Sequence, residues 1–203
     1  MKHRFPRVTD RVVLNPRGTN GSGKSTIVFQ LMKKFGCTAL TDDSLPFKSK
    51  VWAYKLHCYP PMYVVGRYET ATGGCDTVKT LDEVGERICK LSKKGDVLFE
   101  GLLASGLYGR FLALEHKLPR CRFVYCTLDT PLKVCIERVI QRRAAKGKID
   151  ELNPKALTNK FWAVKSSRLG LMKAGSRVAD VPYENPMKAI LEIRSKAHTR
   201  FPR

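Results

Sequence analysis

The sequence predicts a single α/β domain with a mainly parallel sheet, and three observations lead to this prediction. Strand-like and helix-like segments alternate along the 203 residues, of which 43% are hydrophobic, enough for one ordinary core. A glycine-rich loop joins the first strand-like segment to the first helix-like one. No apolar run approaches the roughly 18 residues that a membrane helix needs. We therefore expect one domain over residues 1–203 and no membrane partner.

The strand predictions rest on short apolar segments rich in β-branched and aromatic residues. The aromatic region over residues 47–59 lacks a clear period and is expected to be irregular, ending at the breaker Pro60-Pro61. A five-stranded sheet is therefore expected, with residues 178–181 as a candidate for one more short strand. The five strands are expected at residues 11–14, 37–40, 63–68, 96–100 and 122–128.

The helix predictions rest on apolar residues three and four positions apart and on capping signals. Thr80 and Glu83 form a capping box, whereas Gly36 and Gly95 are placed to end helices. The expected helices cover residues 25–35, 80–91, 107–117, 132–146, 153–173 and 187–194.

The glycine-rich loop reads GTNGSGKS and fits G-x-x-x-x-G-K-[ST] at every fixed position. It follows a predicted strand and opens a predicted helix, which is the context that a P-loop requires. Its backbone N–H groups and the helix N-terminus can surround phosphate oxygens. We expect Lys24 to contact the β- and γ-phosphates and Ser25 to bind Mg²⁺. The expected nucleotide-binding residues are Gly18, Thr19, Asn20, Gly21, Ser22, Gly23, Lys24, Ser25 and Thr26.

This motif makes the fold prediction specific: a P-loop NTPase three-layer sandwich that binds ATP and Mg²⁺. ATP is favoured over GTP because the chain has no Asn-Lys-x-Asp sequence for reading guanine. Helicases and motors usually need a longer chain and often have a strand that ends in Asp-Glu. Here the comparable strand ends in Phe99-Glu100-Gly101, so a small kinase is the better interpretation.

Acidic residues at strand ends are the candidates for the chemistry. In an open parallel sheet, ligands bind outside the carboxyl ends of the strands, so Asp42, Asp43 and Glu100 are expected to point into one crevice. We expect Asp42 or Asp43 to act as general base on an acceptor hydroxyl, with Glu100 near Mg²⁺. The competing interpretation of each is a helix cap or a loop carboxylate.

Two further segments have the composition of a lid and an acceptor pocket. Arg138, Arg142 and Arg143 lie on the helix over residues 132–146 and are expected to close over ATP as an arginine-rich helical lid, although a solvated helix face is also possible. In residues 66–76, GRYETATGGCD, three residues are candidate acceptor contacts. Arg67 could hold a phosphate, Tyr68 could stack on a base and Asp76 could bind a polar group.

The charge of the chain favours a polyanionic partner. Lys and Arg number 38 against 18 Asp and Glu, a net charge of +20, where small soluble domains usually carry about 2–8. Residues 138–173 hold ten basic residues, two acidic ones and the pair Phe161-Trp162. Basic residues combined with aromatic ones are typical of nucleic-acid binding, although Trp162 could equally belong to the core. We expect this segment to contact DNA.

Four segments together resemble a bacteriophage family of small P-loop kinases, the 5-hydroxymethyluracil DNA kinases. They are GTNGSGKST, VGRYETATGGCD, VLFEGLLAS and VCIERVIQRRAAKG. The resemblance implies ATP-dependent phosphorylation of the hydroxymethyl group of 5-hydroxymethyluracil within DNA. It also implies a 5-phosphomethyl product, which later enzymes displace in the hypermodification of thymidine. A base within a duplex would have to be flipped out to react.

Three other functions stay open at the level of sequence. They are a kinase of free deoxynucleosides or deoxynucleotides, a polynucleotide kinase acting on 5′-hydroxyl ends, and a DNA-stimulated ATPase.

The cysteines indicate the cellular compartment. Seven scattered cysteines without zinc-ligand spacing indicate reduced thiols. We expect a cytoplasmic protein, in the host cell if a phage encodes it.

Overall fold

The computed structural model describes residues 11–44, 50–69, 73–147 and 153–199. The strands are β1 (Arg11–Arg17), β2 (Cys37–Thr41), β3 (Val51–Leu56), β4 (Met62–Val65), β5 (Asp96–Leu98), β6 (Cys121–Leu128) and β7 (Val178–Val181). The helices are α1 (Lys24–Phe35), α2 (Leu81–Ser92), α3 (Leu102–Gly106), α4 (Gly109–Lys117), α5 (Leu132–Ala144), α6 (Pro154–Lys173) and α7 (Pro186–Thr199), with a 3₁₀ turn at Cys75–Thr77.

The described residues form a seven-stranded sheet in the order β2-β3-β4-β5-β1-β6-β7, so the expectation of five strands is wrong. Strands β4, β5, β1, β6 and β7 are parallel. Strands β2 and β3 extend this sheet through antiparallel pairing. The two differences from the predicted sheet are β3, which was expected to be irregular, and β7, which was a candidate only.

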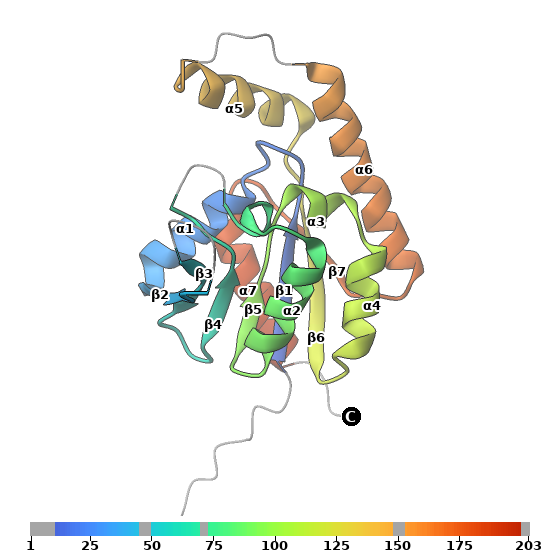
Figure 1. The fold of residues 1–203 in the computed structure, drawn as a ribbon. Coiled ribbons are helices and arrows are strands. Elements are labelled where there is room, and N and C mark those ends of the chain that lie inside the picture. The colour runs from blue at the N-terminus through green and yellow to red at the C-terminus, as the bar shows by residue number, and fades with distance from the viewer. Residues whose placement is uncertain (1–10, 45–49, 70–72, 148–152, 200–203) are drawn as a thin grey trace, which may run out of the picture.

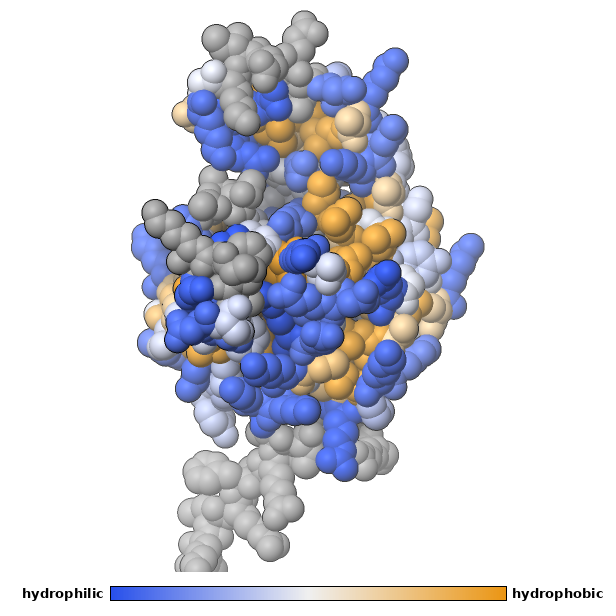
Figure 2. All heavy atoms as spheres, in the orientation of Figure 1, coloured by the Kyte–Doolittle hydropathy of each residue, from blue (hydrophilic) through white to orange (hydrophobic). Residues whose placement is uncertain are grey.

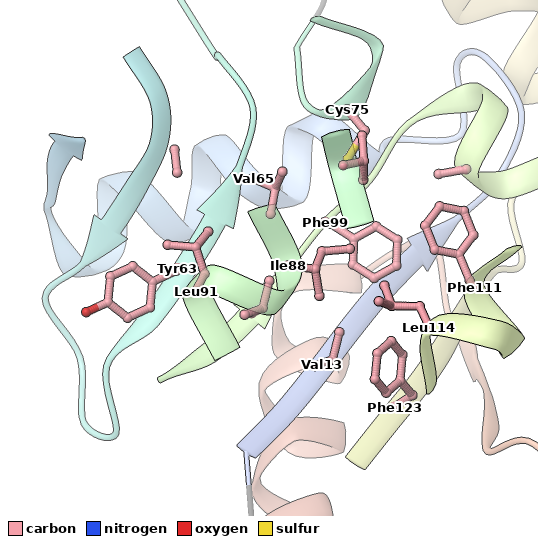
Figure 3. Close-up of a cluster of buried hydrophobic side chains, with 14 of the residues drawn as sticks. Val13, Tyr63, Val65, Cys75, Ile88, Leu91, Phe99, Phe111, Leu114 and Phe123 are labelled. Atoms are coloured by element: carbon pink, nitrogen blue, oxygen red, sulfur yellow. The ribbon is translucent and has the colours of Figure 1, made fainter. Parts of the chain in front are cut away.

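Helices cover both faces of the sheet and make three layers (Figure 1). On one face, α1 and α7 bury Ile27, Leu31 and Ile190 against the sheet. On the other face, α2, α3 and α4 cover a second cluster that includes Ile88, Phe99 and Phe111. Figure 3 shows Phe99 and Phe111 side by side in its right-hand part, with ring centroids 5.0 Å apart. The predicted three-layer arrangement is thus observed.

Helices α5 and α6 extend beyond the carboxyl ends of the parallel strands (Figure 1). Helix α6 is held to the sheet by Arg17, the last residue of β1. The Arg17 guanidinium donates to Ser167 Oγ in α6 (2.5 Å) and to the Ser105 carbonyl in α3 (2.6 Å). Its side chain is fully buried, and burial lowers the pKa of Arg17 to about 10.

At the opposite end of the sheet, a buried carboxylate connects β5 to its neighbours. Asp96 is inaccessible to solvent and accepts hydrogen bonds from the amide of Val12 (2.9 Å) and from Arg194 Nε (2.7 Å). It also lies 2.8 Å from His198 Nε2. These contacts connect β5 to β1 and to α7, which comes last among the described elements.

The predicted helix over residues 107–117 is observed as α4, and an additional short helix, α3, precedes it. Gly106 and Gly109 lie at the break between these two helices and lower the helical propensity there. None of the helices that the described ranges contain is long and apolar enough to cross a membrane.

Candidate active site

The P-loop runs from the end of β1 into the first turn of α1. Gly21 and Gly23 have φ angles of 80° and 99°, a backbone region that favours glycine. A Cβ on Gly21 would lie 2.3 Å from the carbonyl oxygen of Cys135 in α5, so the loop packs closely under that helix. The loop is also held by Thr130, whose hydroxyl donates a hydrogen bond to the carbonyl of Ser22 (2.9 Å).

Lys24 is the first residue of α1 and is only 7% exposed. Its ammonium donates to the carbonyls of Gly18 (2.8 Å) and Thr19 (3.1 Å), which hold it inside the curve of the loop. Burial lowers the pKa of Lys24, and the nearby Glu100 carboxylate partly offsets this effect. A buried ammonium in this position can stabilise a transferring phosphoryl group.

Glu100 follows β5 and faces the start of α1. Its Oε1 accepts hydrogen bonds from Ser25 Oγ (3.0 Å) and from the Tyr68 hydroxyl (3.0 Å). The residue is 1% exposed, and burial raises the pKa of Glu100, against the opposing effects of Lys24, Ser25 and Tyr68. A Cβ on Gly74 would lie 2.6 Å from Glu100 Oε1, so glycine at position 74 permits this close approach.

Asp76 lies beside Glu100 on the 3₁₀ turn. Both of its carboxylate oxygens accept from the amide of Leu102, at 2.9 and 3.0 Å, where α3 begins. The side chain is exposed and lines the same cavity as Lys24, Ser25 and Glu100. Two carboxylates, a hydroxyl and an ammonium therefore meet in one cleft.

This cleft has a volume of about 840 Å³, within the range of small-molecule sites. Its floor is the P-loop and the start of α1. One wall is formed by Gly73, Asp76 and Glu100, and another by Tyr183 and Glu184 in the loop after β7. Since the P-loop lies between these two walls, the cleft has room for a ligand on each side of a phosphate chain.

Two of the three predicted lid arginines also line the cleft. Arg138 and Arg142 are one helical turn apart on α5, and both are exposed. Arg138 Nη1 lies 3.4 Å from the carbonyl oxygen of Gly21. Arg143 is half-buried and is not among the described lining residues. The helix thus presents one pair of arginines to the P-loop, not three.

The structure does not place Asp42 and Asp43 beside the P-loop, so that part of the prediction is wrong. They follow β2, which is the edge strand, four positions from β1 in the sheet. At roughly 4.8 Å per strand this is a separation of about 19 Å. Asp42 accepts from the amide (3.0 Å) and hydroxyl (2.6 Å) of Ser44, and the hydroxyl in particular lowers the pKa of Asp42. Neither aspartate is among the described residues that line the cleft.

Tyr68 occupies a position different from the one expected. The Tyr68 ring is 6% exposed and packs edge-on against Phe29 (5.7 Å between centroids) and Tyr54 (6.2 Å). This ring therefore cannot stack on a base, and its hydroxyl instead orients Glu100. Arg67 is half-buried, and its amide donates to Thr77 Oγ1 (3.0 Å).

Several lining residues were not predicted. Phe29 and Gln30 on α1, and Tyr183 and Glu184 after β7, complete the cleft. The signal for the last two was available, because they follow a strand whose carboxyl end lies at the ligand-binding edge of the sheet. It was missed because β7 itself was uncertain.

The predicted lid and DNA-contacting segment, residues 138–173, forms the end of α5 and all of α6, apart from positions 148–152, which lie outside the described residues. Trp162 is 60% exposed, so it does not belong to the core. Lys155 and Lys160 are exposed on the same helix. This arm therefore presents basic residues and an aromatic ring to solvent.

Comparisons with known proteins agree with this chemistry. The family model described as "5-hmdU DNA kinase" matches residues 4–175. A 5-hmdU DNA kinase of Pseudomonas phage PaMx11 is 34% identical, with 89% of this chain and 96% of the relative covered. A 5-hmdU DNA kinase of Pseudomonas phage M6 is 27% identical at the same coverages. Among solved structures, a gluconokinase from Sinorhizobium meliloti 1021 superposes with a TM-score of 0.49 at 17% identity, covering 96% of this chain and 94% of that one.

Proposed function

Because the chain belongs to the 5-hmdU DNA kinase family, we propose a specific division of roles within its cleft. The protein is a kinase that phosphorylates hydroxymethyluracil in DNA. In our proposal the P-loop holds the triphosphate of ATP, and Asp76 receives the proton of the acceptor hydroxyl. The observation that carries this assignment is that Lys24, Ser25, Glu100 and Asp76 line one cavity.

The residues at the start of α1 fit a nucleoside triphosphate with a divalent ion. The P-loop amides and Lys24 supply positive charge for the β- and γ-phosphates. Ser25 and Glu100 lie 3.0 Å apart and offer hydroxyl and carboxylate oxygens, the donor types that Mg²⁺ prefers. When bound there, Mg²⁺ would neutralise charge on the phosphates. One carboxylate is sufficient, since Mg²⁺ usually keeps water and phosphate oxygens as its other ligands.

The transfer itself needs a proton acceptor beside the hydroxymethyl group. The hydroxymethyl oxygen forms a bond to the γ-phosphorus, the bond from that phosphorus to the β–γ bridging oxygen breaks, and ADP leaves. The proton of the hydroxymethyl group passes to the carboxylate of Asp76. We assign this step to Asp76 because its side chain is exposed in the cleft whereas Glu100 is only 1% exposed, and because Asp42 and Asp43 lie far away.

The remaining roles follow from position. Arg138 and Arg142 offset the charge of the transferring phosphoryl group from the side of α5. Tyr183 and Glu184 form the wall for the nucleoside part of ATP. Arg67 remains a predicted contact of a DNA phosphate.

The test supplies γ-labelled ATP and Mg²⁺ with four acceptors. They are a duplex containing 5-hydroxymethyluracil, the same duplex with thymine, the free hydroxymethyl nucleoside, and its nucleotide. We expect label only in the modified duplex, and on the base after digestion to nucleosides. Label at strand ends, label on the monomers, or phosphate release without labelled DNA would each contradict the proposal. Lys24→Ala is the control that abolishes transfer by the same site.

A further inference from the structure

The depth of the cleft determines how the acceptor base can reach it. Lys24 is 7% exposed and Glu100 is 1% exposed, at the floor of a cavity of about 840 Å³. A cavity of this size is far too small for a double helix. Within a duplex, the target must therefore leave the base stack, and the stack is left with a gap that is costly unless something fills it.

Helix α3 begins at the rim of the cleft, where the amide of its first residue, Leu102, contacts the lining residue Asp76. A Cβ on Gly101 would lie 2.9 Å from Asp76 Oδ1. Leu103 is the next residue after Leu102, whose amide binds Asp76, the proposed general base. Its side chain is 62% exposed, and Leu107 at the end of the same helix is 48% exposed. Figure 2 shows hydrophobic atoms gathered over α3, below α5 and α6.

The turn that carries Leu103 is firmly supported from behind. Ser105 donates to the carbonyl of Gly101 (2.7 Å) and accepts from the amide of Gly18 in the P-loop (3.2 Å). The Ser105 carbonyl in turn accepts from Arg17. A side chain that must push into a base stack needs such a rigid support, because a mobile one would yield instead.

The charges around this rim match a nucleic acid. Lys155 and Lys160 are exposed near the start of α6, which lies above α3 in Figure 1. Cations can bind the phosphates on both strands while an apolar side chain contacts the faces of the bases. A protein partner or a membrane would have no comparable reason to place an exposed leucine directly after the residue that binds Asp76.

We propose that Leu103 enters the duplex in place of the extruded 5-hydroxymethyluracil and fills the gap that the base leaves. This inference rests on the proposed function. In this inference, Leu103 assists extrusion of the base from a paired duplex and takes no part in the phosphoryl transfer itself.

The test compares two duplexes of equal length and charge. In one, 5-hydroxymethyluracil is paired with adenine; in the other it faces thymine and is easily extruded. Leu103→Ala is expected to lower kcat/KM about tenfold on the paired duplex and by less than about twofold on the mismatched one. Leu103→Met, which keeps a large apolar side chain at this position, should retain most of the activity that Leu103→Ala loses. The matched control is Tyr59→Ala, which removes a large side chain 82% exposed in the turn between β3 and β4, away from α3 and from residues 138–173.

An independent readout is the fluorescence of 2-aminopurine next to the target. We expect it to rise when the unsubstituted enzyme binds the paired duplex and to rise much less with Leu103→Ala. An equal loss of activity on both duplexes, or no loss on either, would overturn the proposal. Failure of the function itself would look different, since the unsubstituted enzyme would then label neither duplex on the base.

Discussion

Ser25 donates a hydrogen bond to Glu100 across 3.0 Å, and this contact joins the start of α1 to the end of β5. The two residues are 75 positions apart in sequence and belong to neighbouring strand–loop units of the sheet. Their contact places a hydroxyl and a carboxylate together in the cleft. Asp76 lines the same cleft, and four of our predictions follow from this arrangement.

Asp76→Asn is expected to lower kcat by about 10²–10⁴-fold, the usual contribution of a general base. The amide keeps the shape of the side chain but cannot accept the proton. Asp42→Asn and Asp43→Asn are the matched controls, and their kcat should stay close to that of the unsubstituted enzyme. Label transfer to the modified duplex measures all three. The reverse result, with Asp76→Asn active and either control inactive, would identify Asp42 or Asp43, after β2, as the general base.

The acid side of the pH profile is expected to report Glu100. Burial raises the pKa of this carboxyl above its ordinary value of 4.5, so kcat/KM should fall with decreasing pH at a higher pH than an exposed carboxyl would give. The loss occurs on acidification because the proton removes the charge that binds the metal. Glu100→Gln should lower activity and remove this limb. An unchanged limb in Glu100→Gln would assign it to another group.

Tyr68→Phe is expected to move the same acid limb to higher pH. The phenol donates to Glu100 and lowers the pKa of that carboxyl, so its removal should raise the pKa further. The phenylalanine ring keeps the packing against Phe29 and Tyr54. Above the limb, the rate should change by no more than about tenfold, the scale of one hydrogen bond. Tyr54→Phe is a useful comparison, because that hydroxyl does not contact Glu100 in any described hydrogen bond.

Arg138→Ala and Arg142→Ala should each lower kcat about 10²–10³-fold, as expected for groups that stabilise charge in the transition state. Arg143→Ala should have a much smaller effect on kcat, because Arg143 is not among the described residues of the cleft. Steady-state kinetics with ATP and modified duplex distinguish the three. Equal losses for all three arginines would show that the helix acts as a general basic surface.

Asp96→Ala is expected to lower the free energy of unfolding by about 3–5 kcal/mol, because it leaves the buried Arg194 without its carboxylate. Asp82→Ala is the matched control. It removes an exposed ion pair with Arg110, in which the side chains are 80% and 59% exposed, and should cost less than about 1 kcal/mol. Denaturant titration followed by circular dichroism measures both. Equal losses would mean that the buried contacts of Asp96 with Arg194 and His198, here called the Asp96 clamp, stabilise the fold no more than an exposed ion pair does.

The parts of the site that depend on local sequence were predicted well. The position of the P-loop between β1 and α1 follows from its motif, and the position of Glu100 in the same cleft follows from its place at a strand end. The two helices of the basic arm were also found, because Pro131 and Asn153 mark their starts. Such signals lie within a few residues of the structure that they determine.

The parts that depend on spatial order were predicted poorly. Asp42 and Asp43 were expected near the P-loop because β2 follows α1 in sequence. Strand β3 returns antiparallel beside β2, and both lie outside β4. Only long-range pairing between strands decides this order, and no local period reveals it. The role of Tyr68 was missed for a related reason: burial under Phe29 and Tyr54 depends on three separate segments.

The Asp96 clamp also has a consequence for how the chain folds while it is being synthesised. Residues of β5 and β1 emerge from the ribosome well before Arg194 and His198, which belong to a helix that follows every strand. Until α7 emerges, Asp96 lacks these partners and one face of the sheet lacks Ile190. Because incompletely covered sheets associate readily, the nascent enzyme should depend most on chaperones in the interval before residue 198 is translated.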